Sequence, residues 1–241
     1  MVTKEEFEKY CFEHRLRYEI NYNSYNNAIL KDKWCDDNLF IVLCSIGYIE
    51  TIKWLYKLGN IDIHKNIEKA FINSCCNGYI EVAKWLLKIA KKNGEKINIH
   101  ANDENAFLNS CCNGYIEVVK LLIKISKKNG EMINIHADNE QAFRLSSSNG
   151  HIEVAKFLMK ISKANGDIIN IREMNDFAFR YSSGWNHLEV AKWLCSLCDE
   201  YYIEIKDNKI VKYGIKNMFD KYLDENKEIK KVIKRLQLKI F

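Results

Sequence analysis

The sequence predicts an all-α repeat solenoid, in which short helix-turn-helix units stack side by side. One phrase occurs five times: GYIETIKWL from Gly47, GYIEVAKWL from Gly78, GYIEVVKLL from Gly114, GHIEVAKFL from Gly150 and NHLEVAKWL from Asn186. The steps between these anchors are 31, 36, 36 and 36 residues. A period of this length is typical of helical units that are each too small to bury an apolar face alone. The pattern favours one array of repeats, with a cap at each end, over several unlike domains.

The composition favours an intracellular, cytoplasmic protein. Of the 241 residues, 47% are hydrophobic, which is enough for a sizeable core. No apolar run reaches the length of about 18 residues that a transmembrane helix needs. Residues 1–10 are charged and lack the apolar stretch of a signal peptide. The nine cysteines fall mostly in the repeats, as expected for thiols in a reducing compartment.

Each unit follows the same local pattern. A first helix carries one inward aromatic residue, and an Asn-Gly pair such as Asn113-Gly114 makes the tight turn after it. The second helix starts near a glutamate and has an apolar stripe at helical spacing, for example Val118, Leu122 and Ile125. Asn186 replaces the turn glycine in the last unit, and asparagine tolerates a left-handed turn. The inward aromatic residues are Phe40, Phe71, Phe107, Phe143 and Phe179.

Helix, tight turn, helix and a short extended finger together resemble the ankyrin repeat. The phrase NGHIEVAKFL from Asn149 is similar to the second helix of that family, and Asn-Ile-His at 98–100 and 134–136 falls where the family forms its hairpin finger. The resemblance covers residues 33–198 as five ankyrin-type repeats. The Thr-Pro-Leu-His opening of the family is absent, and three of the steps exceed the family period of about 33 residues. In style the chain resembles the degenerate ankyrin proteins of large DNA viruses.

The two ends depart from the repeat. Residues 1–32 are expected to form an N-terminal helical cap, since terminal units need a wetter outer face. Residues 199–241 are expected to form a C-terminal hairpin and a basic helix. The segments 201–205 and 209–213 have the pattern of strands, with Asp207-Asn208 as the turn between them. A helical pattern follows from about Lys216.

The ankyrin resemblance implies a protein-protein interaction scaffold rather than an enzyme. Its partner, a host or cellular protein, would bind along the concave surface and the fingers of a monomer. No phosphate-binding loop, nucleophile elbow or zinc-protease motif occurs in the chain, and no cofactor is expected.

Three ladders of residues are candidates for contact with that partner. The first is acidic, and its simpler explanation is that an acid in the first turn stabilises a helix. The second lies at the fingers; metal binding is not expected, because repeats about 8–10 Å apart are too far apart for zinc bonds of about 2.0–2.1 Å. The third lies just before each turn, where its aromatic member could equally pack against the C-terminal cap. In order, the ladders are Asp37, Glu68, Glu104, Glu140 and Asp176; His64, His100, His136 and Arg172; and Asn77, Asn113, Asn149 and Trp185.

The basic C-terminal segment supports an alternative function. From Lys209 to Phe241 the chain has ten Lys or Arg and four Asp or Glu, a net charge of +6 in a chain of net charge +5. Such a segment could contact nucleic acid or an anionic membrane surface, although the same pattern suits a capping helix. The basic residues in question are Lys227, Lys230, Lys231, Lys234, Arg235 and Lys239.

Overall fold

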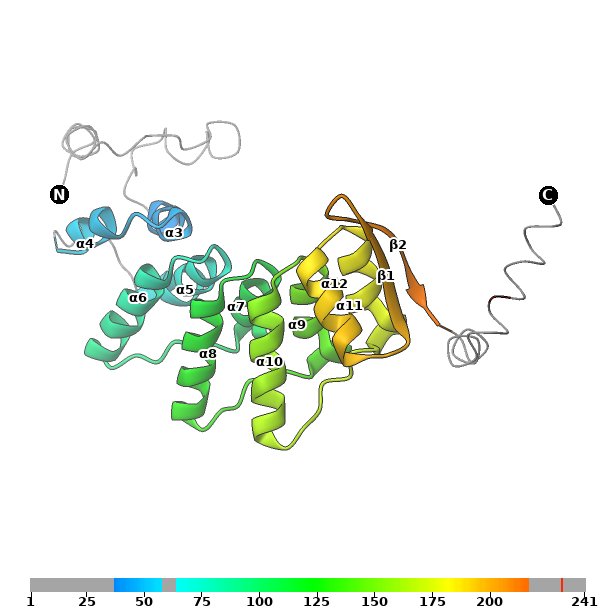
Figure 1. Cartoon of the computed structure of the whole chain (residues 1–241). Coiled ribbons are helices and arrows are strands. Elements are labelled where there is room, and N and C mark those ends of the chain that lie inside the picture. The colour runs from blue at the N-terminus through cyan, green and yellow to red at the C-terminus, as the bar shows by residue number, and fades with distance from the viewer. Residues whose placement is uncertain (1–36, 58–63, 217–230, 232–241) are drawn as a thin grey trace. The chain divides into compact units, whose positions relative to one another are not determined.

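The computed structural model describes residues 37–57, 64–216 and Lys231 (Figure 1). These residues contain ten α-helices, one short 3-10 helix and two β-strands. The chain divides into two compact units, Met1–Ile133 and Asn134–Phe241. The predicted N-terminal cap over residues 1–32 and the predicted basic helix beyond Lys216 lie outside the described residues, apart from Lys231.

The first unit consists of helix-turn-helix pairs. The first helices of successive pairs pack against one another, α3 on α5 and α5 on α7. Each first helix also packs on the second helix of its own pair. The elements are α3 (Asp37–Ile46), α4 (Ile49–Lys57), the 3-10 helix η1 (His64–Asn66), α5 (Ile67–Cys76), α6 (Ile80–Lys92), α7 (Ala101–Cys112) and α8 (Ile116–Asn129).

The second unit contains two further pairs and a hairpin. Helix α9 packs on α10 and α11, and α11 packs on α12. Strand β1 lies against α12 and strand β2 against α11, as the orange hairpin in Figure 1 shows. The elements are α9 (Ala137–Ser148), α10 (Ile152–Asn165), α11 (Glu173–Gly184), α12 (Leu188–Leu197), β1 (Tyr201–Lys206) and β2 (Lys209–Ile215).

The core of both units is built from the same two repeat positions. The predicted inward phenylalanines are no more than 1% exposed, and a leucine in each second helix is fully buried. Burying one such side chain stabilises the fold by about 1.5–3 kcal/mol. The helical-repeat prediction is therefore confirmed at the level of packing. The leucines are Leu55, Leu86, Leu122, Leu158 and Leu194.

The turn glycines are required by packing as well as by backbone conformation. Gly78 has a φ of +77°, and a Cβ added there would lie 2.7 Å from the ring of Tyr115 in the next pair. A Cβ added at Gly150 would likewise lie 2.5 Å from the ring of His187. Tyr79, Tyr115 and His187, each the residue after an anchor, thus pack over the glycine of the preceding turn in their own unit, where no side chain fits. Asn186 ends the series with a φ of +62°, as its tolerance of left-handed turns predicts.

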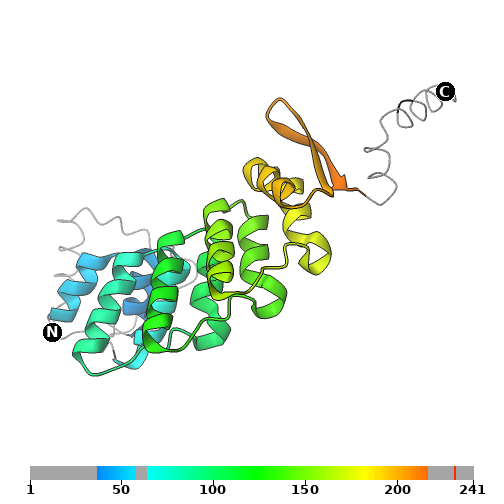
Figure 2. The same ribbon diagram turned by 60° about the horizontal axis from the view of Figure 1, so that its bottom comes forward.

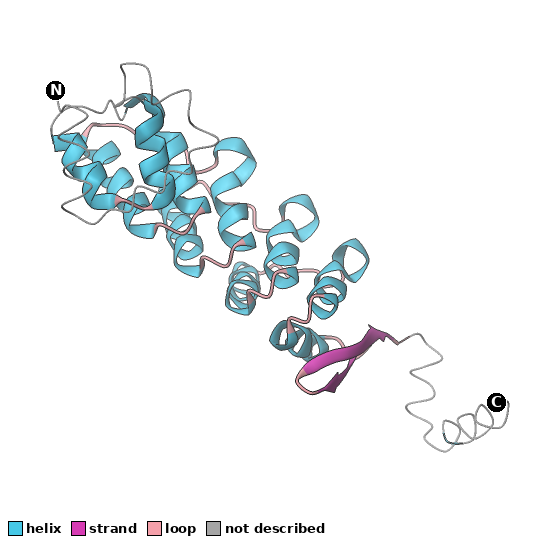
Figure 3. Cartoon of the chain, turned by 90° about the horizontal axis from the view of Figure 1, so that it is seen from above, coloured by secondary structure: helices cyan, strands magenta, loops and turns pink. Residues whose placement is uncertain are grey.

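The C-terminal hairpin forms as predicted. Strands β1 and β2 form an antiparallel hairpin (Figures 2 and 3). A bulge interrupts their pairing between Glu204 and Ile205. Asp207 and Asn208 both have positive φ, the conformation of the two-residue turn that matches the twist of paired strands. This hairpin is the one sheet in the described part of the chain. The finger segments 95–98 and 131–134 are accordingly not paired as strands. None of the described helices is long and apolar enough to cross a lipid bilayer.

Candidate functional site

A left-handed turn precedes the first helix in three of the repeats. Residues 102–104, 138–140 and 174–176 all have φ between +49° and +62°. Asparagine and aspartate adopt this conformation more readily than other side chains, because they can hydrogen-bond locally. The third residue of each turn is a member of the acidic ladder. These acids therefore precede the right-handed part of the helix and do not have the conformation expected of its first turn.

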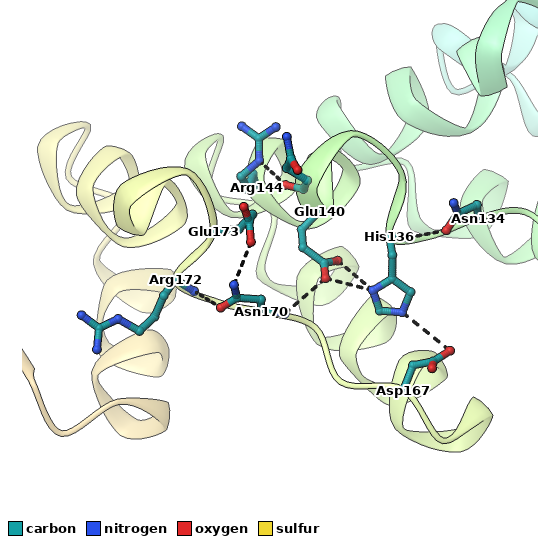
Figure 4. Close-up of polar contacts among 9 residues, drawn as sticks. Asn134, His136, Glu140, Arg144, Asp167, Asn170, Arg172 and Glu173 are labelled. Carbon is teal, nitrogen blue, oxygen red and sulfur yellow. Dashed lines mark hydrogen bonds and ion pairs between the residues drawn. The ribbon is translucent and has the colours of Figure 1, made fainter.

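Glu140 shows what this conformation achieves. Its carboxylate is 7% exposed and accepts a hydrogen bond from the main-chain N–H of Asn170, 3.2 Å away in the next finger. It also contacts Nδ1 of His136 at 2.9 Å and 3.0 Å (Figure 4). The His136 ring then faces Asp167, with 3.9 Å between Nε2 and Oδ2. One acid thus joins the finger of its own repeat to the finger of the next.

The first unit repeats this arrangement in part. His100 Nδ1 lies 2.6 Å from Glu104, and His100 Nε2 lies 3.8 Å from Glu131. Glu68 accepts a hydrogen bond of 3.0 Å from the main-chain N–H of Asn98, as Glu140 does from Asn170. His64 pairs with Glu95. Within each unit, the two predicted ladders, acidic and fingertip, are therefore brought together, and we call these contacts the finger network.

A second set of acids in this network was not predicted from the sequence. Glu95, Glu131 and Asp167 each follow the glycine that ends a second helix, and each faces the finger histidine of the preceding repeat. The recurrence of an acid directly after Gly94, Gly130 and Gly166 could have identified this second set from the sequence. An ion pair with Lys96 lowers the pKa of Glu131 below its ordinary value.

The hairpin completes the network in the last repeat. Asp176, 6% exposed, receives hydrogen bonds from Arg172 Nε at 3.1 Å and from the Tyr201 hydroxyl at 2.7 Å. Arg172 also donates to Glu200 at 2.6 Å, and this contact is the largest contribution raising its pKa. Tyr201 and Glu200 thus occupy the roles that Asn170 and Asp167 have one repeat earlier.

The acids of the network are engaged within the protein. Glu140 and Asp176 are buried, and the Glu104 side chain is only 19% exposed. Glu68 remains exposed although it accepts the Asn98 bond. The side chain of Asp37 lies outside the described part of the chain. These placements favour a structural role for the ladder over direct contact with a partner.

The residues before each turn lie on the surface. Asn77, Asn113 and Asn149 are exposed at the ends of α5, α7 and α9. Trp185, at the equivalent end of α11, is 71% exposed. Packing of Trp185 against the cap, the alternative interpretation, is therefore not seen in the described residues.

An aromatic cluster on α11 was also missed by sequence reasoning. The rings of Phe177 and Tyr181 stack with centroids 4.2 Å apart, and the Arg144 guanidinium lies 5.1 Å from the Phe177 centroid. Tyr181 is 45% exposed. An alignment of the repeats could have revealed the cluster, because the earlier units have an amide or an aliphatic residue at most of the positions equivalent to Phe177 and Tyr181.

The described residues show no arrangement suited to catalysis by a thiol or a metal. Burial raises the pKa of Cys75 and Cys111, so both remain thiols rather than nucleophilic thiolates. Cys195 and Cys198, which have the spacing of half a zinc site, are free. No group of three His, Cys, Asp or Glu in residues 37–57 and 64–216 could hold a metal ion.

Comparison with known families supplies the assignment. A family model described as "Ankyrin repeats (3 copies)" matches residues 39–131, 87–172 and 109–209. These overlapping matches span more than two thirds of the chain. The chain belongs to the ankyrin repeat family.

Several solved structures are similar to this ankyrin protein, and one of them comes from a bacterium. It is the X-ray structure of an ankyrin repeat family protein from Legionella pneumophila, at 25% sequence identity and a TM-score of 0.47. The similarity covers 61% of this chain and 41% of that one, so this chain spans less than half of the Legionella protein. No curated protein matches the chain.

Proposed function

We propose that this ankyrin protein is a non-enzymatic interaction scaffold that binds a partner protein through the exposed ends of its first helices and the adjacent finger surface. The observation that carries the proposal is the division of the repeat into two kinds of position. The phenylalanine and leucine positions are buried in every described repeat, whereas Asn77, Asn113, Asn149 and Trp185 are all exposed. Within each unit, exposed side chains on a folded helix pair suit binding, because little ordering entropy opposes it.

The finger network supports this role indirectly. Glu140 fixes the main chain of the next finger through its bond to Asn170, and Glu68 does the same for Asn98. A surface held in one conformation before binding loses less entropy when a partner is bound. We therefore assign Glu104, Glu140 and Asp176 to pre-organisation of the surface, and the turn-preceding residues to the contact itself.

We propose that the partner is a cellular protein met in a reducing compartment. The free cysteines of the described residues support that environment. The stylistic resemblance to ankyrin proteins of large DNA viruses would make the partner a host protein. The alternative, nucleic-acid or membrane contact through the basic segment, rests on charge alone, because Lys227, Lys230, Lys234, Arg235 and Lys239 lie outside the described residues.

The test is affinity capture followed by comparison of matched variants. Asn77→Arg, Asn149→Arg and Trp185→Ala together alter the proposed contact surface. Lys84→Ala and Lys120→Ala form the control, because both lysines are exposed on second helices.

We expect a captured protein to be lost with the first variant and kept with the control. Retention by both variants would place the contact elsewhere. Capture that disappears on nuclease treatment would instead favour the basic segment.

A further inference from the structure

We propose that the α11 end of the second unit binds an acidic peptide segment of a partner protein, one that also carries apolar side chains. The contact surface is an aromatic stripe, defined as Phe177, Tyr181, Trp185 and Tyr213. This inference rests on the proposed function and adds to it the location of the contact and the chemistry of the partner.

The stripe is continuous over two elements. Phe177, Tyr181 and Trp185 are spaced four residues apart, so they lie along one face of α11. The first two are stacked at 4.2 Å, and the Trp185 main-chain N–H donates to the Tyr181 carbonyl at 2.9 Å. Tyr213 of β2 reaches Gly184, where an added Cβ would lie 3.1 Å from its hydroxyl. Three of the four rings are strongly exposed: Trp185 is 71%, Tyr181 45% and Tyr213 41% exposed.

The repeat fold does not require these aromatic residues. At the positions of Tyr181 and Trp185, helices α5 and α7 have only asparagine. The equivalent position of Phe177 is polar in the three preceding repeats, as Lys69, Asn105 and Gln141. Those repeats pack with the same buried phenylalanine and leucine as the last one. Exposed aromatic residues that are not needed to pack one repeat on the next are typical of binding hot spots.

The charge beside the stripe is positive. Arg144 lies over Phe177, and Arg180 is exposed one turn further along α11. Arg144 donates to the main-chain carbonyls of Asn139 and Asp138, at 2.6 Å and 2.9 Å. Among the described residues, neither guanidinium pairs with a carboxylate.

The acids of the neighbouring elements are mostly engaged. Asp176 is bonded to Arg172 and Tyr201, and Glu173 accepts from the Asn170 amide at 2.7 Å. Asp138 is the acid exposed nearby on α9. Two guanidinium groups beside exposed rings therefore present donors for carboxylates next to a surface for apolar side chains.

The experiment selects peptides on the full-length protein from a displayed library of random peptides, each about a dozen residues long. We expect the selected peptides to be rich in Asp and Glu flanking Leu, Phe or Trp. Tyr181→Ala with Trp185→Ala should weaken their binding about thirtyfold, and Arg180→Glu about tenfold. Binding should also weaken as salt is added. Lys120→Ala, at an exposed residue of α8 outside the proposed contact surface, is the control and should bind like the parent.

Three results would overturn the inference. The selected peptides could be basic, or they could bind the Tyr181→Ala, Trp185→Ala variant as tightly as the parent. Iodide could also fail to quench the fluorescence of Trp185 in peptide-free protein. The Trp185 signal is measured as the difference between the parent and Trp185→Phe. Such a failure would show that a second copy, or residues 217–241, already covers the stripe. Peptides whose binding is lost only with Asn77→Arg would reject the stripe yet leave the proposed function intact.

Discussion

Tyr201 is bound to the last repeat at both ends of its side chain: the ring stacks on Phe179 and the hydroxyl donates to Asp176. The ring centroids of Tyr201 and Phe179 are 4.1 Å apart, with 5° between the ring planes, and the hydrogen bond is 2.7 Å long. Tyr201 is 4% exposed. The hairpin therefore covers the apolar end of the array and also supplies the donor that the next finger would provide.

Tyr201→Phe should destabilise the protein by about 1–3 kcal/mol. The stacking on Phe179 survives this change, but the buried Asp176 carboxylate loses a donor, and an unsatisfied buried group costs about that much. Urea unfolding measures the effect. Tyr202→Phe, at the half-buried neighbour in β1, is the control and should change the unfolding free energy by less than about 0.5 kcal/mol. Equal effects of the two variants would contradict the assigned role of the hydrogen bond.

The stability of the protein should fall at high pH because of Tyr201. Burial, reinforced by the bond to Asp176, raises the pKa of the phenol above its ordinary value of about 10. The unfolded chain then loses this proton first, so the contribution is complete below about pH 10 and is lost as the pH rises further. The unfolding free energy of the parent should decline more steeply than that of Tyr201→Phe between about pH 10 and 11. Parallel profiles would contradict the prediction.

Glu140→Ala should cost about 1–3 kcal/mol, because the Asn170 main-chain N–H and the His136 ring both lose their acceptor. Glu140→Gln keeps an acceptor oxygen and should cost less. The exposed Glu153 provides the control, since removing a surface acid changes stability by less than about 0.5 kcal/mol. Chemical denaturation of the three variants separates these outcomes. If Glu140→Ala behaves like Glu153→Ala, the acid does not fix the finger.

Gly78→Ala and Gly94→Ala separate backbone strain from steric packing. Both glycines have positive φ, +77° and +74°, so alanine costs about 1 kcal/mol at either site. Only at Gly78 does the new methyl group meet the Tyr115 ring, which adds about 1–3 kcal/mol; at Gly94 nothing lies within 4 Å. Thermal unfolding should show Gly78→Ala as the more damaging change. Tyr115→Ala combined with Gly78→Ala should recover part of that difference.

Met174→Asn should stabilise the protein by about 1 kcal/mol. Met174 has a φ of +54° in the left-handed turn before α11, where the earlier repeats have Asp138 and Asn102. A long apolar side chain is poorly suited to this conformation, whereas asparagine adopts it readily. Differential scanning calorimetry measures the gain. Asp138→Asn is the matched control and should be neutral; a gain at both positions, or at neither, would contradict the strain argument.

Local rules of chain geometry were enough to predict much of this fold. The period fixed the helix-turn-helix units, and the apolar spacing identified Phe143 and Leu122 as core residues, which are 0% exposed. The turn at Asp207-Asn208 and the left-handed Asn186 were predicted because both depend on the conformational preference of single residues.

The chemistry of the fingers could not be predicted in the same way. In the sequence, Glu140 has the position of an ordinary acid at the start of a helix, and Asp167 is one polar residue after a glycine. Their roles depend on contacts with residues about thirty positions away, from Glu140 to Asn170 and from Asp167 to His136. The left-handed turn that directs Glu140 toward the next finger is itself stabilised by those contacts.

The sequence by itself thus determined the repeat unit, its core and its closing hairpin, because these follow from periodicity and local conformational preference. Only the tertiary structure decided which side chains are bound internally and which remain on the surface. It placed Asp176 inside the protein, between Arg172 and Tyr201, and left Trp185 exposed. The physical reason is that burial and hydrogen-bond partners are properties of stacked repeats, and no single repeat contains them.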